Sequence, residues 1–272
     1  MPELPEVEAV RRRLAPVLTL ARIADVDVRR PDLRVPFPRR FRARLVGQTV
    51  LTLTRRAKYL LAVLSSRETL IVHLGMSGSF RVDASPDNAA EPDRHDHVVF
   101  RLASGDTVTF NDPRRFGLMT LLTPAQLARH PVLSRLGPEP LSPGFDAAAL
   151  ARACRGKKIA LKVALLDQRI VAGIGNIYAS EALHLAGLSP FRRASTIATP
   201  AGAPREAAER LTEAIKRVLT IAIDRTSRTY RSSRFRVYDR EGARCLRRGC
   251  GGVIKRRTQA GRSTFYCPVC QR

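Results

Sequence analysis

Residues 49–64 have the sequence TVLTLTRRAKYLLAVL, two β-branched, alternating runs on either side of a basic turn. Such alternation over short runs is typical of strands that bury one face in a core. The same texture recurs in residues 69–82, 97–102 and 107–122, and Ser104-Gly105-Asp106 supplies a hairpin turn between the last two. We therefore predict a β-sandwich for the first part of the chain.

Helical patterns lie on both sides of these strands. Residues 6–18 have helical period, with an apolar stripe made of Val7, Val10, Leu14 and Leu18. A linker rich in Pro, Gly and Ser over residues 131–145 precedes a second region. That region holds four Ala- and Leu-rich segments of helical period, at residues 147–155, 158–166, 177–185 and 207–223. The expected fold class is α+β, a sandwich with a leading helix followed by a helical region.

The chain is strongly basic. Its 272 residues include 48 Lys and Arg against 24 Asp and Glu, a formal net charge of +24. Such a field favours polyanions, with nucleic acid as the first candidate, and an Arg-rich proteome is the alternative explanation. No apolar run approaches the ~18 residues of a membrane span, and the N-terminus carries acid where a secretory signal carries base. We expect an intracellular protein with no membrane partner.

Four of the five cysteines gather near the C-terminus. Four residues separate Cys245 from Cys250, and two separate Cys267 from Cys270. Two short-spaced pairs joined by a hairpin-length spacer are typical of a tetrahedral zinc site, and a reducing compartment favours metal over disulfides. Four thiolates complete the coordination, so we predict one structural zinc ion. The fifth cysteine, Cys154, falls in a helical segment and is expected to be buried and unreactive.

The first six residues, MPELPE, place a nucleophile beside two acids. If Met1 is removed, Pro2 presents a secondary amine, which surrounding positive charge keeps neutral. Such an amine can attack a sugar carbon and form an iminium that activates the neighbouring C–H bond for elimination. Glu3 can give a proton to the opening sugar ring and later accept one, with Glu6 close by. A processed N-terminus with Pro and Glu at a helix start is the structural alternative.

A glycine turn lies between two helical segments, in the sequence Gly173-Ile174-Gly175-Asn176. Glycines let the backbone approach a ligand, and the following helix N-terminus offers unpaired N–H groups to a phosphate. Asn176 adds a side-chain donor. A simple connection between helices is the alternative interpretation.

Five residues of the first region fall at strand ends or turns: Lys58, His73, Met76, Arg114 and Phe116. A duplex from which one base is extruded needs side chains that fill the gap and stack on its neighbours. An apolar Met, a hydrogen-bonding Arg and a stacking Phe match that need. The alternative is that the Met and Phe belong to the core and the Arg is solvated.

Together these motifs resemble the formamidopyrimidine-DNA glycosylase / endonuclease VIII family of base-excision repair enzymes, and most of all its bacterial formamidopyrimidine-DNA glycosylases. The resemblance covers essentially the whole chain. The motifs that carry it are MPELPEVE (residues 1–8), RRAKY (55–59), HLGMSG (73–78), NDPRRFG (111–117), GIGNIYA (173–179) and the closing cysteine cluster.

The resemblance implies three parts: a catalytic β-sandwich at residues 1–133, a helix–two-turn–helix DNA-binding domain at 134–234, and a β-hairpin zinc finger at 235–272. It implies a monomer in the bacterial cytoplasm. Its partner would be double-stranded DNA that contains an oxidised base or an abasic site, bound in the cleft between the two domains.

The resemblance also assigns roles. Pro2 would attack C1′ and displace the base, Glu3 would act as acid and base, and Glu6 would support the pocket. The phosphates around the lesion would be held by Lys58, His73, Asn176 and Arg262. Of these, Lys58 and Arg262 would also belong to the catalytic set. Tyr178 would lie at the DNA. Met76, Arg114 and Phe116 would fill the void. Removal of 8-oxoguanine or formamidopyrimidines would be followed by β- and δ-elimination, with no cofactor in the chemistry.

Two departures from the family pattern leave alternatives open. Family fingers usually have two residues, not four, between the first pair of cysteines. Residues 226–236, TSRTYRSSRFR, lack the longer Gly/Thr-rich segment that closes over flipped 8-oxoguanine. That feature favours an endonuclease VIII-like enzyme for oxidised pyrimidines, whereas MPELPEVE is the purine-type N-terminus. A non-catalytic zinc-containing nucleic-acid binder explains the charge and the cysteines, but it leaves Pro2 and Glu3 without a role.

Overall fold

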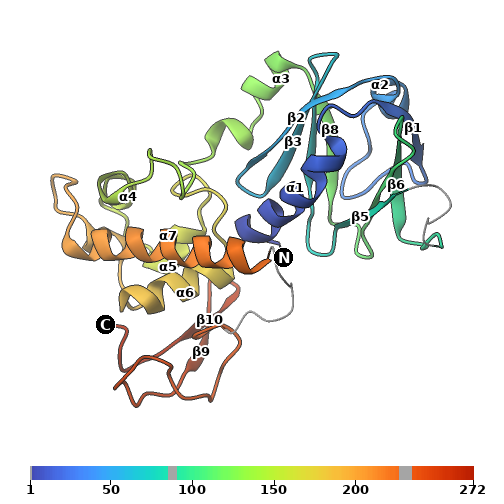
Figure 1. Cartoon of the computed structure of the whole chain (residues 1–272). Coiled ribbons are helices and arrows are strands. Elements are labelled where there is room, and N and C mark those ends of the chain that lie inside the picture. Colours follow the sequence, from blue (N-terminus) through green and yellow to red (C-terminus); the bar gives the residue numbers. More distant parts are fainter. Residues whose placement is uncertain (1, 85–90, 227–234) are drawn as a thin grey trace. The chain divides into compact units, whose positions relative to one another are not determined.

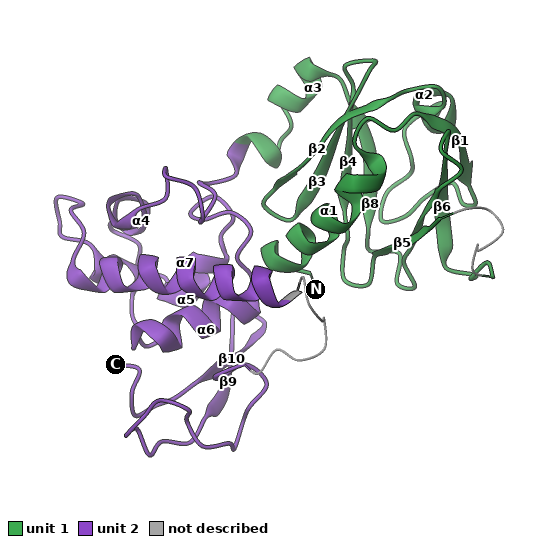
Figure 2. Cartoon of the chain, in the orientation of Figure 1, with its two compact units in different colours: residues 1–134 green, residues 135–272 purple. Residues whose placement is uncertain are grey.

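The computed structural model describes residues 2–84, 91–226 and 235–272. The chain forms two compact units, residues 1–134 and residues 135–272 (Figure 2), and each is described by itself. The predicted order of sandwich, helices and closing hairpin is confirmed. The finer division at residues 133 and 234 stays a prediction.

Two four-stranded antiparallel sheets and a leading helix form the first unit (Figure 1). Helix α1 spans Leu4–Leu18. One sheet has the order β2 (Val50–Arg56), β3 (Tyr59–Leu64), β4 (Thr69–His73) and β8 (Leu118–Leu122). The other has the order β1 (Ile23–Val28), β6 (Asp96–Leu102), β7 (Thr107–Asn111) and β5 (Ser79–Asp83). Short helices α2 (Phe41–Leu45) and α3 (Pro124–Ala128) complete the connections, and the 3-10 turn η2 (Leu133–Arg135) lies where the chain passes from the first unit to the second.

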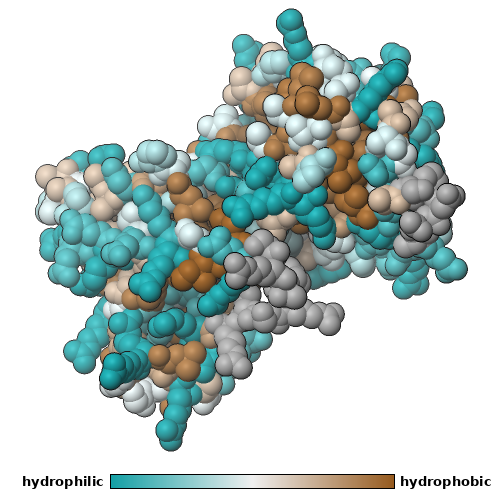
Figure 3. Space-filling view, in the orientation of Figure 1, coloured by the Kyte–Doolittle hydropathy of each residue, from teal (hydrophilic) through white to brown (hydrophobic). Residues whose placement is uncertain are grey.

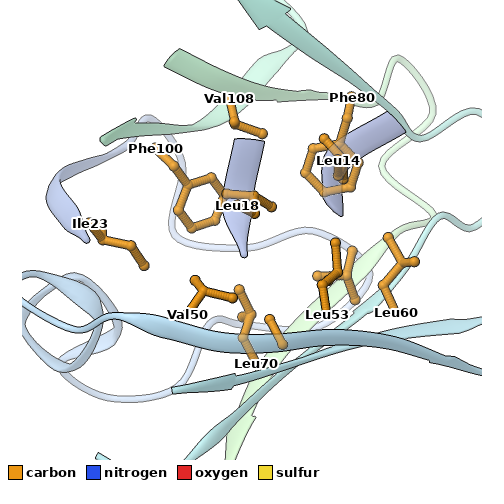
Figure 4. A pocket seen from close by; sticks show the side chains of 12 residues that line it. Leu14, Leu18, Ile23, Val50, Leu53, Leu60, Leu70, Phe80, Phe100 and Val108 are labelled. Atoms are coloured by element: carbon orange, nitrogen blue, oxygen red, sulfur yellow. The ribbon is translucent and has the colours of Figure 1, made fainter. Parts of the chain in front are cut away.

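Side chains of α1 and of both sheets meet in one apolar core. Leu14 of α1, Val50 of β2 and Phe100 of β6 surround a cavity of about 30 Å³ (Figure 4). All residues that line this cavity are apolar. A buried water needs two to four polar partners, so the cavity is a dry packing gap of the core.

Strand β1 is missing from the pattern-based prediction. Its pairing with β6 shifts register between Ile23 and Asp25. A bulge inserts an extra residue into a strand, and this breaks the strict alternation on which strand prediction depends. The run 69–82 also divides into β4 and β5, which belong to different sheets. The turn between them therefore carries the chain from one sheet to the other.

Helices build most of the second unit: α4 (Ala147–Cys154), α5 (Leu161–Leu166), α6 (Asn176–Ala186), the 3-10 turn η3 (Ala194–Ile197) and α7 (Glu206–Thr226). Helices α6 and α7 pack against each other. Helix α5 begins later than its periodicity predicts, because Ala160 pairs with Arg193 in a β-bridge. Cys154 is fully buried in the helical core, which confirms the prediction that it is buried. Burial raises the pKa of its thiol to about 11, as expected for a cysteine with little thiolate at neutral pH.

A small module closes the second unit. Its hairpin pairs β9 (Lys255–Gln259) with β10 (Arg262–Tyr266). The two turn residues, Ala260 and Gly261, both have left-handed backbone, with φ of 48° and 72°, as two-residue hairpin turns require. The core of this module consists of Val237, Ile254, Phe265 and Cys267.

Hydrophilic residues project from the visible face of both units, with apolar patches between them (Figure 3). Among the described residues, no helix combines the length and the apolar character needed to cross a bilayer.

Candidate functional site

The N-terminal end of α1 carries the predicted nucleophile and acid. Glu3 is the N-cap residue of α1, and its backbone N–H donates to Oε2 of Glu6 at 2.8 Å. The Glu3 side chain is 2% exposed, and Pro2 is half-buried. Glu6 thus fixes the backbone that leads back to Pro2. The structure brings Pro2, Glu3 and Glu6 together, whereas Met1 lies outside the described residues.

Glu8 joins α1 to the hairpin that carries Lys58. Its carboxylate accepts hydrogen bonds from Arg11 at 2.8 Å and from Arg55 at 3.2 Å. Burial by itself would raise the pKa of Glu8. The pKa is nevertheless held below its usual range by hydrogen bonds from Arg11 and Arg12 and by the charge of Arg55. Arg55 also donates to the carbonyl of Ala57, whose φ is 53°. This left-handed residue turns the chain from β2 into β3 and directly precedes the buried Lys58.

His73 ends β4 beside Tyr59 of β3, with ring centroids 4.8 Å apart. The Gly75 N–H donates to its Nδ1 at 3.0 Å, so the ring proton resides on Nε2. Burial and the charges of Lys58 and Arg34 lower the pKa of His73 to about 4. His73 is therefore a neutral donor at physiological pH. Sequence analysis missed Arg34, an exposed cation whose backbone N–H donates to the Gly117 carbonyl at 3.0 Å.

Asp112, a residue that sequence analysis passed over, connects two loops of the first unit. It is fully buried. Its carboxylate accepts the Ser77 hydroxyl at 2.5 Å and the Gly117 N–H at 2.7 Å. Ser77 in turn accepts the Arg114 N–H at 3.1 Å. A single buried carboxylate thus ties the turn after β4 to the loop before β8.

These two loops present the predicted gap-filling residues. Met76 and Phe116 are 44% and 43% exposed, and the Arg114 guanidinium lies 4.7 Å from the centre of the Phe116 ring. Both apolar side chains lie outside the core, which contradicts the alternative that they pack inside it. Gly75 is left-handed (φ 64°), and a Cβ there would come within 2.3 Å of the Phe116 backbone. The close approach of the loops therefore requires glycine at this position.

In the second unit, Asn176 begins α6 and is held by a buried lysine. Lys162 is 1% exposed and donates to Oδ1 of Asn176 at 2.6 Å. It also donates to the Ser263 carbonyl and the Thr264 hydroxyl, at 3.0 and 2.8 Å. The Asn176 amide donates to the same Ser263 carbonyl at 3.0 Å. Asn176 therefore lies beside the start of β10, where the exposed Arg262 precedes Ser263.

The glycine turn before α6 is ordered by Gln168. Its side chain accepts the Gly173 N–H at 2.9 Å and donates to the Ile174 carbonyl at 2.8 Å. Gly173 has a φ of 84°. Tyr178, which the resemblance places at the DNA, is 3% exposed and belongs to the helical core.

Glu181 of α6 anchors the chain where the closing module begins. Its carboxylate accepts three consecutive backbone N–H groups, those of Arg236, Val237 and Tyr238, at 2.8, 2.9 and 2.9 Å. No sequence pattern singles out this contact, because it joins positions 55 or more residues apart. The shortened segment noted in the sequence, residues 226–236, falls largely outside the described residues.

The four clustered cysteines fit one zinc ion. Their sulfur atoms all lie within 4.8 Å of one another. The Cys245–Cys270 and Cys250–Cys267 sulfur distances are 3.9 and 3.5 Å. A tetrahedral zinc with Zn–S bonds of about 2.3 Å requires sulfur separations of about 3.8 Å. The predicted ligand set is therefore already gathered, and one ion would be held by four thiolates.

Comparison with known proteins covers both units. The family model described as "Formamidopyrimidine-DNA glycosylase N-terminal domain" matches residues 1–119. "Formamidopyrimidine-DNA glycosylase H2TH domain" matches residues 136–233, and "Zinc finger found in FPG and IleRS" matches residues 242–272. The chain belongs to the formamidopyrimidine-DNA glycosylase family.

Individual relatives agree with this family. Formamidopyrimidine-DNA glycosylases of Rhodopseudomonas palustris (strain BisA53) and Bradyrhizobium diazoefficiens are 56% and 54% identical, and each match covers 100% of both chains. Among solved structures, the Lactococcus lactis enzyme bound to AP-site DNA has a TM-score of 0.87 at 31% identity, with 99% of each chain covered. A MutM complex with DNA that contains carbocyclic 8-oxo-G also has a TM-score of 0.87, at 30% identity over 100% of both chains.

Family membership confirms the resemblance inferred from the motifs. Every residue proposed for the site falls within a range that a family model matches. The N-terminal model covers the residues of α1 and of the two loops joined by Asp112 (the Asp112 loops). The H2TH model covers Asn176 and Tyr178, and the zinc-finger model covers Arg262 and the four cysteines.

Proposed function

We propose that this protein is a bifunctional DNA glycosylase and AP lyase that removes oxidised bases, 8-oxoguanine and formamidopyrimidines, from double-stranded DNA. The observation that carries this proposal is the start of α1 in a chain of this family. There Pro2 directly precedes a buried acid, Glu3, and Glu6 fixes the backbone between them.

The chemistry follows from a free secondary amine at Pro2. Its nitrogen lone pair attacks C1′, the N-glycosidic bond breaks, and the base leaves with the bonding electrons. Glu3 protonates the ring oxygen as the sugar opens, which yields an iminium between Pro2 and C1′. Loss of the C2′ proton then expels the 3′ phosphate, and loss of the C4′ proton expels the 5′ phosphate. A one-nucleoside gap flanked by phosphates remains.

Other residues would bind the DNA around this step. Cations and donors for the phosphates come from Lys58, His73, Asn176 and Arg262. Met76, Arg114 and Phe116 would occupy the space left by the extruded nucleotide. A zinc ion on the four cysteines would hold the β9–β10 hairpin and leave no open position for a reacting group.

Oxidised purines are the proposed lesion class. The relatives that are 53–56% identical are named formamidopyrimidine-DNA glycosylases, and solved relatives include complexes with FAPY-dG DNA and 8-oxo-G DNA. The short segment 226–236 remains the feature that favours oxidised pyrimidines. A non-catalytic zinc protein would have no use for the amine and acid at the start of α1.

Borohydride trapping tests the mechanism and the lesion class together, because borohydride reduces an iminium to a stable covalent bond. We expect a protein–DNA adduct with a duplex that contains 8-oxoguanine, and a weaker adduct with a matched 5-hydroxyuracil duplex. A predominant 5-hydroxyuracil adduct would move the enzyme to the endonuclease VIII side. No adduct with either duplex or with an abasic site would support the binding-protein alternative.

Two variants sharpen the trapping experiment. Pro2→Gly keeps an amine but changes its basicity and geometry, so turnover should fall while binding to lesion DNA stays largely intact. Glu3→Gln keeps the amine and removes the acid, so base release should fall by about 10²–10⁴-fold. Unchanged kinetics in Pro2→Gly, or an N-terminal mass that retains Met1, would refute the nucleophile.

A further inference from the structure

The closing zinc-finger module, residues 235–272, docks against the C-terminal end of α6. The Arg272 N–H donates to the Gly187 carbonyl at 3.1 Å. The Gln271 side chain donates to the Leu188 carbonyl at 3.0 Å. These bonds place the cysteine cluster against the last turn of the helix that begins with Asn176.

His184 lies in that last turn and faces the metal site. It is fully buried, and its Nε2 lies 3.2 Å from Sγ of Cys245. Its Nδ1 has no hydrogen-bond partner in the described part of the chain. Among the described residues, the hydrogen-bond partner of this ring is thus a zinc-ligand sulfur. A histidine satisfied only by the helical core would instead bond a carbonyl or hydroxyl.

The chemistry of the sulfur fixes the direction of this hydrogen bond. A zinc-bound cysteine is a thiolate and can only accept. The opposite tautomer would place an N–H on the unpartnered Nδ1 and turn the Nε2 lone pair toward a negatively charged sulfur. Both changes are unfavourable in a buried site. His184 therefore donates from Nε2 to Cys245.

The lengthened first cysteine loop reaches the same helix end. Four residues lie between Cys245 and Cys250, and the second of them is Arg247. The Arg247 guanidinium donates to the carbonyls of His184 and Leu185, the latter at 3.1 Å. Its backbone N–H points to the Cys245 sulfur at 3.4 Å. A cation on the last carbonyls of a helix is also favoured by the helix dipole.

We propose that His184 is an outer hydrogen-bond donor to the zinc-bound thiolate of Cys245, and that Arg247 caps α6 so that this donor stays in place. Four thiolates on one Zn²⁺ carry two excess negative charges, and a hydrogen bond withdraws charge from the sulfur. Outer partners of metal ligands commonly change metal affinity by about 10–100-fold. His184 and Arg247 are thus positioning residues that couple the metal site to the helix that carries Asn176.

Zinc transfer from the full-length, zinc-loaded protein to an excess of a chromophoric chelator tests the proposal. His184→Phe keeps a ring and removes the donor, whereas His184→Gln keeps an N–H donor. We expect zinc to leave the Phe variant about 10–100-fold faster than the wild type, and the Gln variant at a rate between the two. Arg248→Ala is the matched control, because it removes an exposed cation from the same loop and should leave the rate unchanged.

The rates of zinc release from the variants decide between hydrogen bonding and packing. A Phe variant that releases zinc no faster than Arg248→Ala overturns the proposal. A Gln variant as fast as the Phe variant also overturns it, because packing and not hydrogen bonding would then matter. Arg247→Gln should release zinc faster than Arg248→Ala, and an equal rate would remove Arg247 from the proposal.

Cadmium-113 in place of zinc provides a test without any substitution. A hydrogen bond to a metal-bound thiolate transmits scalar coupling from the metal to the donor proton. The Nε2–H resonance of His184 should therefore be split by ¹¹³Cd. A resolved, unsplit resonance in the folded, cadmium-loaded protein would overturn the proposal. Neither measurement uses DNA, so its result is independent of the proposed enzyme activity.

Discussion

The loops around Asp112 and the zinc-finger module both present residues proposed to contact DNA, but they are held in different ways. The Asp112 loops emerge from a sandwich whose core combines α1 and two sheets, and one buried carboxylate joins them. The finger has a core of Val237, Ile254, Phe265 and Cys267. It depends instead on four thiolates and on hydrogen bonds to α6 and to the residues that directly follow it.

The two regions should therefore lose their structure under different perturbations. A small module cannot bury enough apolar surface to fold by itself, so its metal supplies folding free energy directly. The sandwich needs no such ion. The conformation of its two loops depends instead on the buried carboxylate of Asp112. Perturbing the metal should therefore affect Arg262 and spare His73, whereas perturbing Asp112 should do the reverse.

The largest effect is expected from loss of zinc. Cys267→Ser removes one of four ligands, and structural zinc contributes about 10–16 kcal/mol to the folding of zinc-finger peptides. We expect zinc content to fall to background and lesion-duplex affinity to fall with it, because the hairpin that carries Arg262 loses its metal support, with the sandwich still folded. Metal analysis and fluorescence anisotropy measure the two quantities.

Cys154→Ser is the matched control for this change. Cys154 lies in the helical core, away from the metal ligands. It should keep its full zinc content, although the buried hydroxyl lowers the thermal midpoint. Full zinc content in Cys267→Ser would contradict the four-cysteine site.

A smaller loss is expected from Lys162→Met. The substitution keeps the aliphatic length but removes an ammonium that donates to Asn176, Ser263 and Thr264. Loss of three hydrogen bonds from this charged donor costs about 2–4 kcal/mol, although Asn176 still donates to the Ser263 carbonyl. Denaturant unfolding should show this loss, and DNA affinity should fall because Asn176 and Arg262 share the same support. Lys158→Met, at an exposed lysine nearby, should change neither quantity.

Asp112→Asn tests the first unit in the same way. The amide presents an N–H₂ where either the Ser77 hydroxyl or the Gly117 N–H now donates. Loss of one hydrogen bond to a charged group costs about 1.5–3 kcal/mol. We expect lower thermal stability, unchanged zinc content, and weaker unstacking of 2-aminopurine placed opposite the lesion. Ser77→Ala should show a smaller effect of the same kind, and a normal 2-aminopurine signal in both variants would refute the role of this carboxylate.

Sequence patterns predict the strands, helices and metal ligands that depend on residues close together along the chain. Alternation finds the strands at 49–64 and 107–122, helical period finds α6 and α7, and cysteine spacing finds the metal site. The candidate residues at the start of α1 and on the exposed loops follow from the family motifs. In each case, residues that are close in sequence carry the whole signal.

The supporting residues escape prediction because their partners are distant in sequence. Asp112 meets Ser77 across 35 residues, and Lys162 meets Ser263 across 101. Before the fold is known, Asp112 is a member of the NDPRRFG motif without an assigned role, and Lys162 looks like any solvated charge. Strand β1 escapes for a local reason, since its bulge breaks the alternation. Sequence thus finds the residues proposed to touch DNA more readily than the residues that hold them.

Burial of His73 also makes the stability of the protein depend on pH. The folded pKa of His73 is about 4, against an ordinary value of 6.5. Between about pH 6.5 and pH 4, His73 is protonated in the unfolded chain but stays neutral in the folded protein. Proton binding therefore stabilises the unfolded state, and the free energy of unfolding decreases as the pH falls toward 4. His73→Gln should lose that part of the decline. Thermal midpoints of wild type and variant between pH 7 and pH 5 check this, and parallel curves would contradict a neutral His73.

The salt dependence of DNA binding gives the smallest and most selective contrast. Arg262 is an exposed cation at the start of β10, so replacing it with Ala should reduce the slope of log K against log salt by about one unit. His73 is a neutral donor, so His73→Ala should weaken binding and leave the slope unchanged, because no counterion is released by a neutral contact. Arg248→Ala, an exposed cation of the first cysteine loop, shows how much slope any surface charge contributes. Equal slopes for Arg262→Ala and Arg248→Ala would mean that Arg262 acts only through the general field of the chain. A reduced slope for His73→Ala would mean that its ring is charged at the DNA.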